Sequence, residues 1–327
     1  MNTSFVGSRR VAPFVRVHKQ DYINGPQGMQ LHSCAFGNPD ATHRVVCLHG
    51  GLQAKECFRY VYEGLAPHDC FVVGFDLPCH GLSGPDGRER FVPGPQLWVE
   101  SIDAVLQHYG LQDGPVVFLG WSMAGLPIRN YLQSKPAATK LAGLILVAAT
   151  LDLKSLFSLM ARYSPEAWEI TMRMMDMSLP VSEYYAALLP FVDKLWCVPP
   201  SLTQYYQTVG YTFLSALKSR WSMAALMSTQ APGDTAELLS RVTCPLLFIR
   251  GQEDALVSRA YFYQLVEMVP AAQRTVFEPA GIGHSPFLEA PDAFNAAVLE
   301  FLNGPVSRFS RSQESLMERA SGNSRQR

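Results

Sequence analysis

Short apolar segments alternate with longer amphipathic segments along most of the chain, and this alternation limits the folds available to it. The segments with the length of buried strands are 44–48, 70–76, 115–119, 144–148, 245–249 and 274–277. They are apolar at most positions, as is typical of parallel strands covered on both faces. The segments with helical spacing are 95–109, 123–134, 258–269 and 290–302. This order predicts an α/β fold with a doubly wound, mostly parallel sheet.

Other segments complete the predicted organisation. Segments 14–18 and 29–36 flank Asn-Gly-Pro and predict an antiparallel pair at one edge of the sheet. Residues 152–233 contain no clear strand and are rich in Met, Tyr and Trp at helical spacing. We expect a helical insertion whose large side chains form its own core, while some line a pocket against the sheet. The predicted parts are a leader (1–20), a core (21–151 and 234–303), a helical cap (152–233) and a disordered tail (304–327).

Composition and charge exclude several functional classes. The 27 Lys and Arg residues are balanced by 28 Asp and Glu residues, so the basic surplus of a nucleic-acid binder is absent. The longest apolar run, 141–149, is well below the about 18 residues of a membrane span, so no stable membrane insertion is expected. The hydrophobic fraction of 48% is enough for a large core.

The cysteines and the N-terminus bear on location. The seven cysteines are odd in number, include no Cys-x-x-Cys pair and lack metal-ligand spacing. Reduced thiols in a cytoplasmic protein without a metal site are therefore expected. Ser-Arg-Arg at 8–10 is similar to a twin-arginine signal, but no apolar segment follows it. We interpret the N-terminus as a solvated leader, with a transit peptide as the alternative.

A candidate nucleophile lies where a strand meets a helix. Residues 119–125 read Leu-Gly-Trp-Ser-Met-Ala-Gly. Small residues around Ser122 permit a sharp strand-to-helix turn that exposes its hydroxyl group. The first amides of the following helix, Met123 in particular, then point toward a developing negative charge. Alone, such a motif is equally compatible with an ordinary tight turn.

Three further segments supply the partners that a nucleophilic serine needs. His-Gly-Gly at 49–51 follows an earlier strand, and there Gly51, with Leu52 as the alternative, is the expected oxyanion donor beside Met123. Asp254 follows a later strand, at the sheet edge where site residues collect. His284 lies on a glycine-containing loop after the last strand. Leu52 and Trp121 are the expected substrate-binding residues.

With these motifs in place, the chain resembles the α/β-hydrolase superfamily over about residues 30–303. The Asp-Leu-Pro-Cys-His-Gly-Leu-Ser segment at 76–83 also resembles a structural loop of that family. The resemblance implies an eight-stranded sheet with a cap and a Ser122–His284–Asp254 triad. Ala124 and Cys79 stand where the family usually has glycines. His80, in the 76–83 segment, is expected to be structural.

The triad assignment implies covalent catalysis. His284 would remove the proton of Ser122, and Asp254 would orient the imidazole ring and stabilise its charged form. Asp152, after the preceding strand, is the alternative acid. The expected activity is hydrolysis of an ester, thioester or lactone with an apolar acyl or aromatic part, without a metal or organic cofactor.

Three other functions remain open from the sequence. One is carbon–carbon bond hydrolysis or lyase chemistry, for which Arg129, Arg162 and Arg220 could bind carboxylates. Another is small-molecule binding with little turnover, and a third is acyl transfer to an acceptor other than water. The sequence leaves the substrate and the oligomeric state undetermined.

Overall fold

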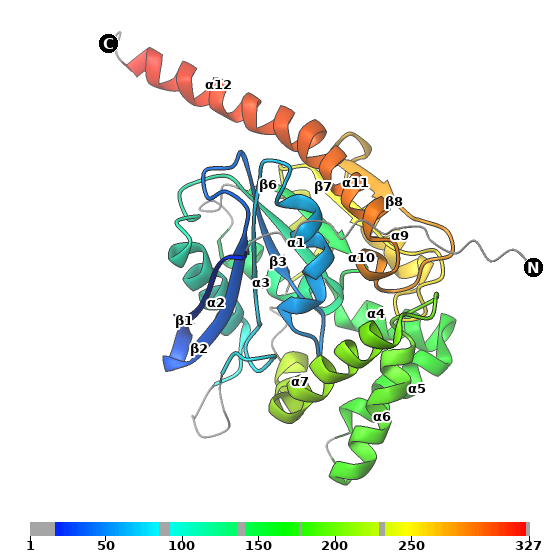
Figure 1. The fold of residues 1–327 in the computed structure, drawn as a ribbon. Helices are drawn as coiled ribbons and strands as arrows, with labels where there is room; N and C mark the ends of the chain where they lie inside the picture. The colour runs from blue at the N-terminus through cyan, green and yellow to red at the C-terminus, as the bar shows by residue number, and fades with distance from the viewer. Residues whose placement is uncertain (1–16, 85–91, 136–140, 177, 229–232, 325–327) are drawn as a thin grey trace, which may run out of the picture.

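An eight-stranded sheet forms the centre of the molecule (Figure 1). The computed structural model describes residues 17–84, 92–135, 141–176, 178–228 and 233–324. The strand order is β1-β2-β4-β3-β5-β6-β7-β8, with β1 and β2 antiparallel to their neighbours and the other strands parallel. The strands are β1 (Val17–Asn24), β2 (Gln30–Phe36), β3 (His43–Leu48), β4 (Cys70–Phe75), β5 (Val116–Trp121), β6 (Leu141–Val147), β7 (Leu246–Ile249) and β8 (Arg274–Phe277).

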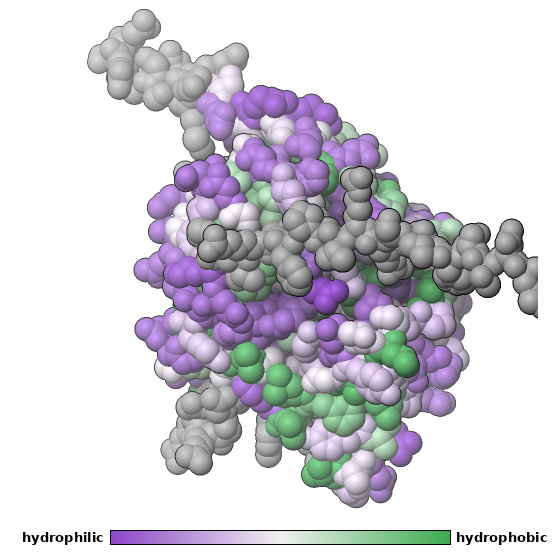
Figure 2. All heavy atoms as spheres, viewed as in Figure 1, coloured by the Kyte–Doolittle hydropathy of each residue, from purple (hydrophilic) through white to green (hydrophobic). Residues whose placement is uncertain are grey.

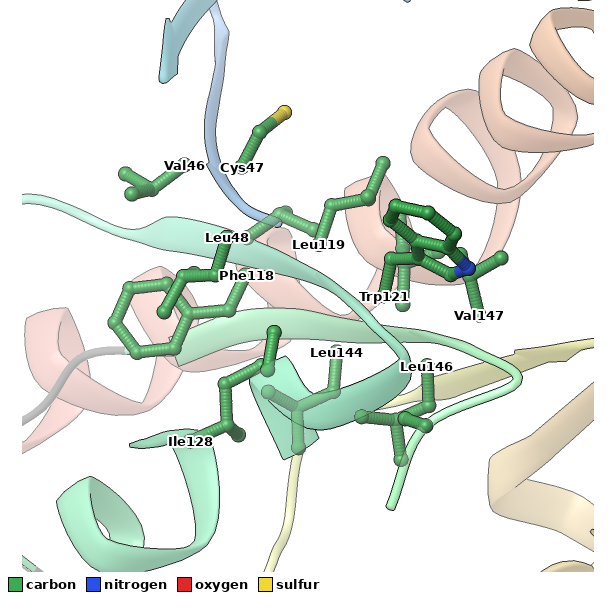
Figure 3. Packing of buried hydrophobic residues seen from close by; sticks show 14 of the residues in the cluster. Val46, Cys47, Leu48, Phe118, Leu119, Trp121, Ile128, Leu144, Leu146 and Val147 are labelled. Atoms are coloured by element: carbon green, nitrogen blue, oxygen red, sulfur yellow. The ribbon is translucent and has the colours of Figure 1, made fainter. Parts of the chain in front are cut away.

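The parallel strands form where apolar residues occupy both faces. Every residue of β4, β5 and β7 is buried, which is the burial expected for strands covered by helices on both sides. Figure 3 shows Phe118 and Leu119 of β5 among Val46, Leu48 and Leu144 from the neighbouring strands. Consecutive residues of a strand point to opposite faces, so this strand contributes to the core on both sides. The six predicted parallel strands correspond to β3–β8, and the doubly wound fold is confirmed.

Helices cover both faces of the sheet (Figure 1). Helices α1 (Arg59–Leu65) and α11 (Pro291–Phe301) pack together on one face, and α2 (Pro95–His108) and α3 (Gly125–Ser134) pack together on the other. Helices α8 (Thr235–Ser240), α9 (Arg259–Glu267) and α10 (Pro286–Glu289) complete the core. The four helices predicted from their spacing correspond to α2, α3, α9 and α11, whereas α1 was not predicted.

Both ends of the chain differ from the predictions. Strand β1 begins at Val17 and extends to Asn24, later than the predicted segment 14–18, of which residues 14–16 lie outside the described residues. The residues of this strand are mostly polar, as is typical of a half-exposed edge strand, so the apolar pattern did not reveal its bounds. Toward the C-terminus, the predicted disordered tail is a helix, α12 (Ser307–Ser324), which continues from α11 through a π-helical turn at Leu302–Val306. No proline follows Pro305, and Phe309 packs against the core.

In the described part of residues 152–233, the insertion between β6 and α8 contains four helices. They are α4 (Leu153–Tyr163), α5 (Pro165–Met175), α6 (Val181–Asp193) and α7 (Leu202–Ser228). Figure 1 shows them side by side beyond one end of the sheet. A small cluster that includes Tyr184 and Leu188 packs these helices onto Leu52 of the core. This insertion therefore covers the loops that follow β3 and β5.

On the face shown in Figure 2, exposed apolar side chains gather over the cap. Figure 2 shows apolar side chains gathered over the part of the molecule where Figure 1 places α5, α6 and α7. Val181 and Leu202 are among the large apolar side chains exposed there. Within the described ranges, no helix has the length and apolar character needed to span a bilayer.

Candidate active site

Ser122 lies on a strained turn between β5 and α3. Its φ angle is 54°, a left-handed conformation that is uncommon outside glycine. A hydrogen bond of 2.8 Å from the Thr150 amide to the Ser122 carbonyl holds this turn. Backbone strain of this kind concentrates at functional sites. The hydroxyl group is consequently lifted out of the sheet while the strand before it remains buried.

Close backbone packing around Ser122 requires glycine. A Cβ atom on Gly125 would lie 2.3 Å from the Thr150 carbonyl oxygen. On Gly50 it would lie 3.2 Å from the Ser122 Cβ atom. By contrast, Ala124, at the position where the family usually has glycine, is buried with an ordinary helical backbone. Alanine is therefore accommodated there without strain.

Asp254 and His284 form a buried pair. The Nδ1 atom of His284 is 2.8 Å from Oδ2 of Asp254, and the two side chains are 1% and 0% exposed. The other carboxylate oxygen accepts hydrogen bonds from the Leu256 and Val257 amides, at 2.8 and 2.9 Å. These bonds fix the carboxylate, and the carboxylate in turn orients the imidazole ring. The Nε2 atom of His284 is buried and has no hydrogen-bond partner in the described part of the chain.

Asp152, the alternative acid, has a different role. Its side chain accepts a hydrogen bond of 2.9 Å from the Ser155 amide and caps the N-terminus of α4. The geometry therefore pairs Asp254, and not Asp152, with His284. His80, the expected structural histidine, is buried against His49, and its Nδ1 atom donates to the Pro78 carbonyl oxygen. Burial lowers the pKa of His80 to about 4.

A cavity of about 110 Å³ connects the predicted site residues with the cap. Ser122, His284, Gly51, Met123 and Leu52 all line it. No Asp, Glu, Lys or Arg lines this cavity in the part of the chain that is described. The remaining lining residues are mostly apolar and come largely from the cap: Leu126, Thr150, Leu153, Leu156, Phe157, Met160, Thr171, Met174, Met175, Phe191, Leu256 and Val257.

The two predicted oxyanion donors, Gly51 and Met123, lie close together in the lining of this cavity. A Cβ atom on Gly51 would lie 3.3 Å from the Met123 sulfur atom, so the loop after β3 approaches the turn after β5 closely. The hydrogen bonds of turns and loops in the described residues include neither the Gly51 amide nor the Met123 amide as a donor. Leu52, with a φ angle of 59°, also has a strained backbone.

Trp121, in the core, supports the loop that carries His284, called here the histidine loop. Its side chain is 1% exposed and does not belong to the residues that line the described cavity. The indole Nε1 atom donates a hydrogen bond of 2.9 Å to the carbonyl oxygen of His284. The indole ring also packs edge-on against Phe287. Figure 3 shows Trp121 at the end of β5, within the core.

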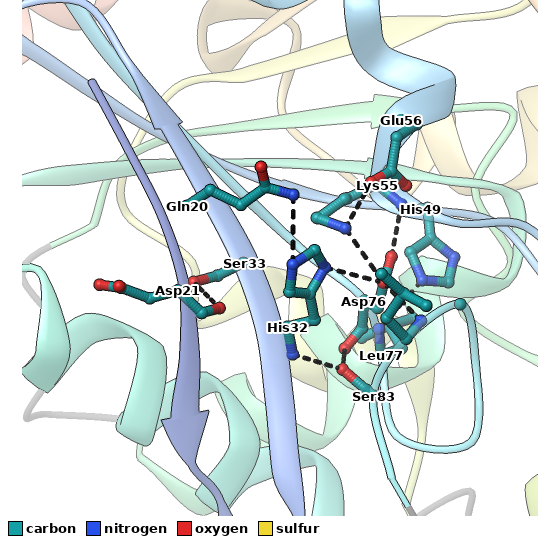
Figure 4. A network of polar contacts seen from close by, with 12 residues as sticks. Gln20, Asp21, His32, Ser33, His49, Lys55, Glu56, Asp76, Leu77 and Ser83 are labelled. Atoms are coloured by element: carbon teal, nitrogen blue, oxygen red, sulfur yellow. Dashed lines mark hydrogen bonds and ion pairs between the residues drawn. The ribbon is translucent and has the colours of Figure 1, made fainter. Parts of the chain in front are cut away.

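A buried ion pair joins the loop after β3 to the loop after β4 (Figure 4). The Lys55 ammonium lies 3.1 Å from Asp76 Oδ2, and the Lys55 amide donates to Asp76 Oδ1 at 2.8 Å. The Leu82 amide donates to Asp76 Oδ2, also at 2.8 Å. Burial raises the pKa of Asp76, but His32 and Lys55 outweigh it and the net shift is downward. This charged pair holds the chain that carries Gly51. No sequence motif pointed to Lys55, because its partner lies on another loop.

The arginines considered for carboxylate binding do not gather at the cavity. Arg129 is buried, and its guanidinium group donates to the Leu151 and Gly233 carbonyl oxygens at the two ends of the cap. Arg162 is exposed and lies over the ring of Tyr163. The side chain of Arg220 lies outside the described residues.

A second, larger cavity lies apart from these residues. It has a volume of about 220 Å³ and lies between α7 and the α1 region, with Tyr60, Trp196 and Tyr211 in its walls. None of the predicted site residues lines it. Elsewhere in the described ranges, no three His, Cys, Asp or Glu side chains gather as metal ligands. None of the seven cysteines forms a disulfide, and all except Cys197 are buried.

Comparison with known proteins agrees with this architecture. The pimeloyl-[acyl-carrier protein] methyl ester esterase of Xylella fastidiosa strain M23 is 24% identical over 263 residues, which cover 79% of this chain and 94% of the relative. The structure of an esterase from Rhodococcus sp. ECU1013 aligns with a TM-score of 0.71 and 26% identity, over 88% of this chain and 99% of that one.

A putative aryl esterase from Burkholderia cenocepacia has the same fold, with a TM-score of 0.74, 22% identity and coverage of 88% and 100% of the two chains. The model of the alpha/beta hydrolase family matches residues 45–297, most of the chain. The chain belongs to the alpha/beta hydrolase family.

Proposed function

We propose that this protein is a carboxylic-ester hydrolase in which Ser122 is the nucleophile, His284 the general base and Asp254 the residue that orients His284. The buried Asp254–His284 pair, with His284 lining the same cavity as the strained Ser122, is the observation that carries the proposal. Relatives named as esterases agree with this reaction class. A serine needs a base because its hydroxyl group is a weak nucleophile at neutral pH.

The reaction follows from this arrangement. Ser122 Oγ attacks the ester carbonyl carbon while its proton passes to His284 Nε2. That proton then goes to the departing alcohol, which leaves an acyl-enzyme. Water, deprotonated by His284, attacks the acyl-enzyme and releases the acid, and Ser122 recovers its proton. The amides of Gly51 and Met123 stabilise the oxyanion in both steps, and losing one such donor typically costs about 3–4 kcal/mol of barrier.

The cavity favours an uncharged, apolar substituent. Its walls are mostly Leu, Met and Phe side chains, and no Asp, Glu, Lys or Arg of the described structure lines it to balance a bound carboxylate. Met160, Met174 and Met175 adapt easily to ligands of different shape. This absence of counter-charge also argues against the carbon–carbon bond hydrolase alternative, which needs groups that bind substrate carboxylates. The methyl ester of pimeloyl-[acyl-carrier protein], after which the Xylella relative is named, is a further substrate to test.

A set of variants and esters tests the proposal. The wild-type protein should hydrolyse p-nitrophenyl esters of uncharged acids, and prefer them to esters whose acyl chain ends in a carboxylate. Ser122→Ala should lower kcat at least about 1,000-fold without unfolding the protein. Asp103→Asn, on the outer side of α2, should retain full activity. Substantial hydrolysis by folded Ser122→Ala would refute the proposal, and products that require an added alcohol or amine would indicate acyl transfer instead.

A further inference from the structure

The segment after His284 is bound to the cap by one carboxylate. Glu289 ends helix α10, five residues after His284. Its Oε2 atom accepts hydrogen bonds from the amides of Cys197 and Val198, at 2.8 and 3.0 Å. Its Oε1 atom accepts from the amide of Gly283 at 2.9 Å. The carboxylate therefore bridges the cap segment between α6 and α7 and the residue that precedes His284.

The two bridged segments are also in direct backbone contact. A Cβ atom on Gly283 would lie 2.6 Å from the Cys197 nitrogen atom. Both segments direct N–H groups at the same carboxylate, and such donors cannot satisfy one another. A partly buried carboxylate between them accepts from both sides at once. Hydrogen bonds to a charged acceptor are roughly twice as strong as neutral ones.

The cap segment that Glu289 holds leads directly to the wall of the catalytic cavity. Phe191, near the end of α6, lines that cavity. Leu195, between Phe191 and the Glu289 contact, is buried in the main core. On the other side of the carboxylate, His284 lines the same cavity. A displacement at Glu289 would therefore reach both the apolar wall and the predicted base.

We propose that Glu289 is a positioning residue that couples the cap to the histidine loop, so that the substrate wall and His284 are aligned together. This inference rests on the proposed esterase function. Trp121 and Asp254 hold His284 from the core side, at its carbonyl oxygen and its ring. Glu289 supplies a contact from the cap side, through the amide of the preceding residue, Gly283.

Glu289→Gln is the sharpest variant, because it keeps the size of the side chain. An amide has one acceptor oxygen, so the substituted side chain would serve one of the two segments and turn its NH₂ group toward the donors of the other. Glu300→Gln is the matched control, since Glu300 is exposed on α11, a helix that packs against α1 of the core. Activity is measured with p-nitrophenyl acetate and p-nitrophenyl hexanoate, well below the unfolding temperature of each variant.

We expect Glu289→Gln to lower kcat on both esters by about 10- to 100-fold, because misplacement of a catalytic group by about 1 Å can cost 100-fold. KM should rise for the hexanoate ester, which reaches the cap wall, and change little for the acetate ester. Hydrogen exchange followed by mass spectrometry should show faster exchange in residues 195–198 and 281–285 together. Glu300→Gln should match the wild-type protein in every measurement.

Two results would overturn the inference. One is unchanged kcat in the folded Glu289→Gln variant, which would make the contact purely structural. The other is faster exchange in one segment alone, which would show that the two are not coupled. If the wild-type protein hydrolyses no ester, the proposed function fails, and the exchange measurement still tests the coupling by itself.

Discussion

Replacing Lys55 by Met should destabilise the fold far more than breaking a surface ion pair does. Lys55 and Asp76 are 1% and 0% exposed, and their charged atoms lie 3.1 Å apart. Removing one partner of such a pair leaves an uncompensated buried charge, which costs about 3–5 kcal/mol. The pair between Lys194 and Glu166 is shorter, 2.7 Å, but its side chains are 26% and 73% exposed. Lys194→Met should therefore cost at most about 1 kcal/mol.

Urea unfolding at pH 7, with linear extrapolation, measures these differences in the free energy of unfolding. At that pH the contribution of Asp76 is fully present, because its pKa is lowered in the folded state. The contribution disappears only as the pH falls through the lowered value. A double variant, Lys55→Met with Asp76→Asn, removes both charges. We expect it to be more stable than the sum of the single effects predicts, by about 0.5–3 kcal/mol.

The comparison can also refute the reasoning. If Lys55→Met costs less than about 1 kcal/mol, or no more than Lys194→Met, burial does not determine the strength of these pairs. Additive single and double variants would show that Lys55 and Asp76 act independently. Either result would also remove the argument that this pair holds the loop that carries Gly51 in place.

The remaining predictions concern packing, positioning and pH. Trp121→Phe removes the hydrogen bond to the His284 carbonyl oxygen, which is worth about 0.5–1.5 kcal/mol, and should lower kcat by about 2- to 12-fold. Trp98→Phe is the control, because the buried indole N–H of Trp98 has no partner in the described structure, and it should leave the steady-state kinetics unchanged. Gly125→Ala should lower the free energy of unfolding by about 1–3 kcal/mol or more, because the added Cβ atom would meet the Thr150 backbone. Gly210→Ala, at an open position within helix α7, should raise it slightly, and thermal or urea unfolding measures both changes. Burial lowers the pKa of His80 to about 4, so between about pH 6.5 and pH 4 the unfolded chain binds more protons and the fold loses stability as the pH falls. His80→Gln should reduce that slope by up to about 1.4 kcal/mol per pH unit in urea unfolding, and an unchanged slope would contradict the assignment.

The strands and the order of the motifs were predictable because they depend on local sequence. The fully apolar runs that became β4 and β5 leave no exposed face, so their position in a covered parallel sheet follows from the pattern. Ser122, Asp254 and His284 each follow a strand or its loop, and parallel strands bring such positions to one edge. The family resemblance supplied the remaining topology.

Contacts between side chains distant in sequence could not be predicted in this way. Glu289 meets Cys197 across 92 residues, and neither residue belongs to a motif that the sequence analysis singled out. Trp121 is predicted from the sequence as a substrate-binding residue, whereas in the structure its indole N–H donates to the carbonyl oxygen of His284 and its side chain does not line the cavity. In a strand, consecutive side chains point to opposite faces, and the sequence alone does not say which face the cavity occupies.

The C-terminal helix was missed for a different reason. The sequence after Pro305 is polar, and polarity by itself favours a prediction of disorder. A polar segment also forms a helix when it continues one that is already anchored, since the cost of nucleation is then absent. Here α11 is packed against α1, and Phe309 continues the contact with the core.

Labelling with a fluorophosphonate, followed by peptide mass spectrometry, tests the central claim most directly. The reagent reacts with a serine whose proton is removed by a neighbouring base, so it reports on Ser122 and His284 together. We predict a single adduct on Ser122 that is absent from Ser122→Ala and strongly reduced in His284→Ala. A folded wild-type protein that forms no adduct, or an adduct on another serine, would contradict the assignment of this site as a serine hydrolase centre.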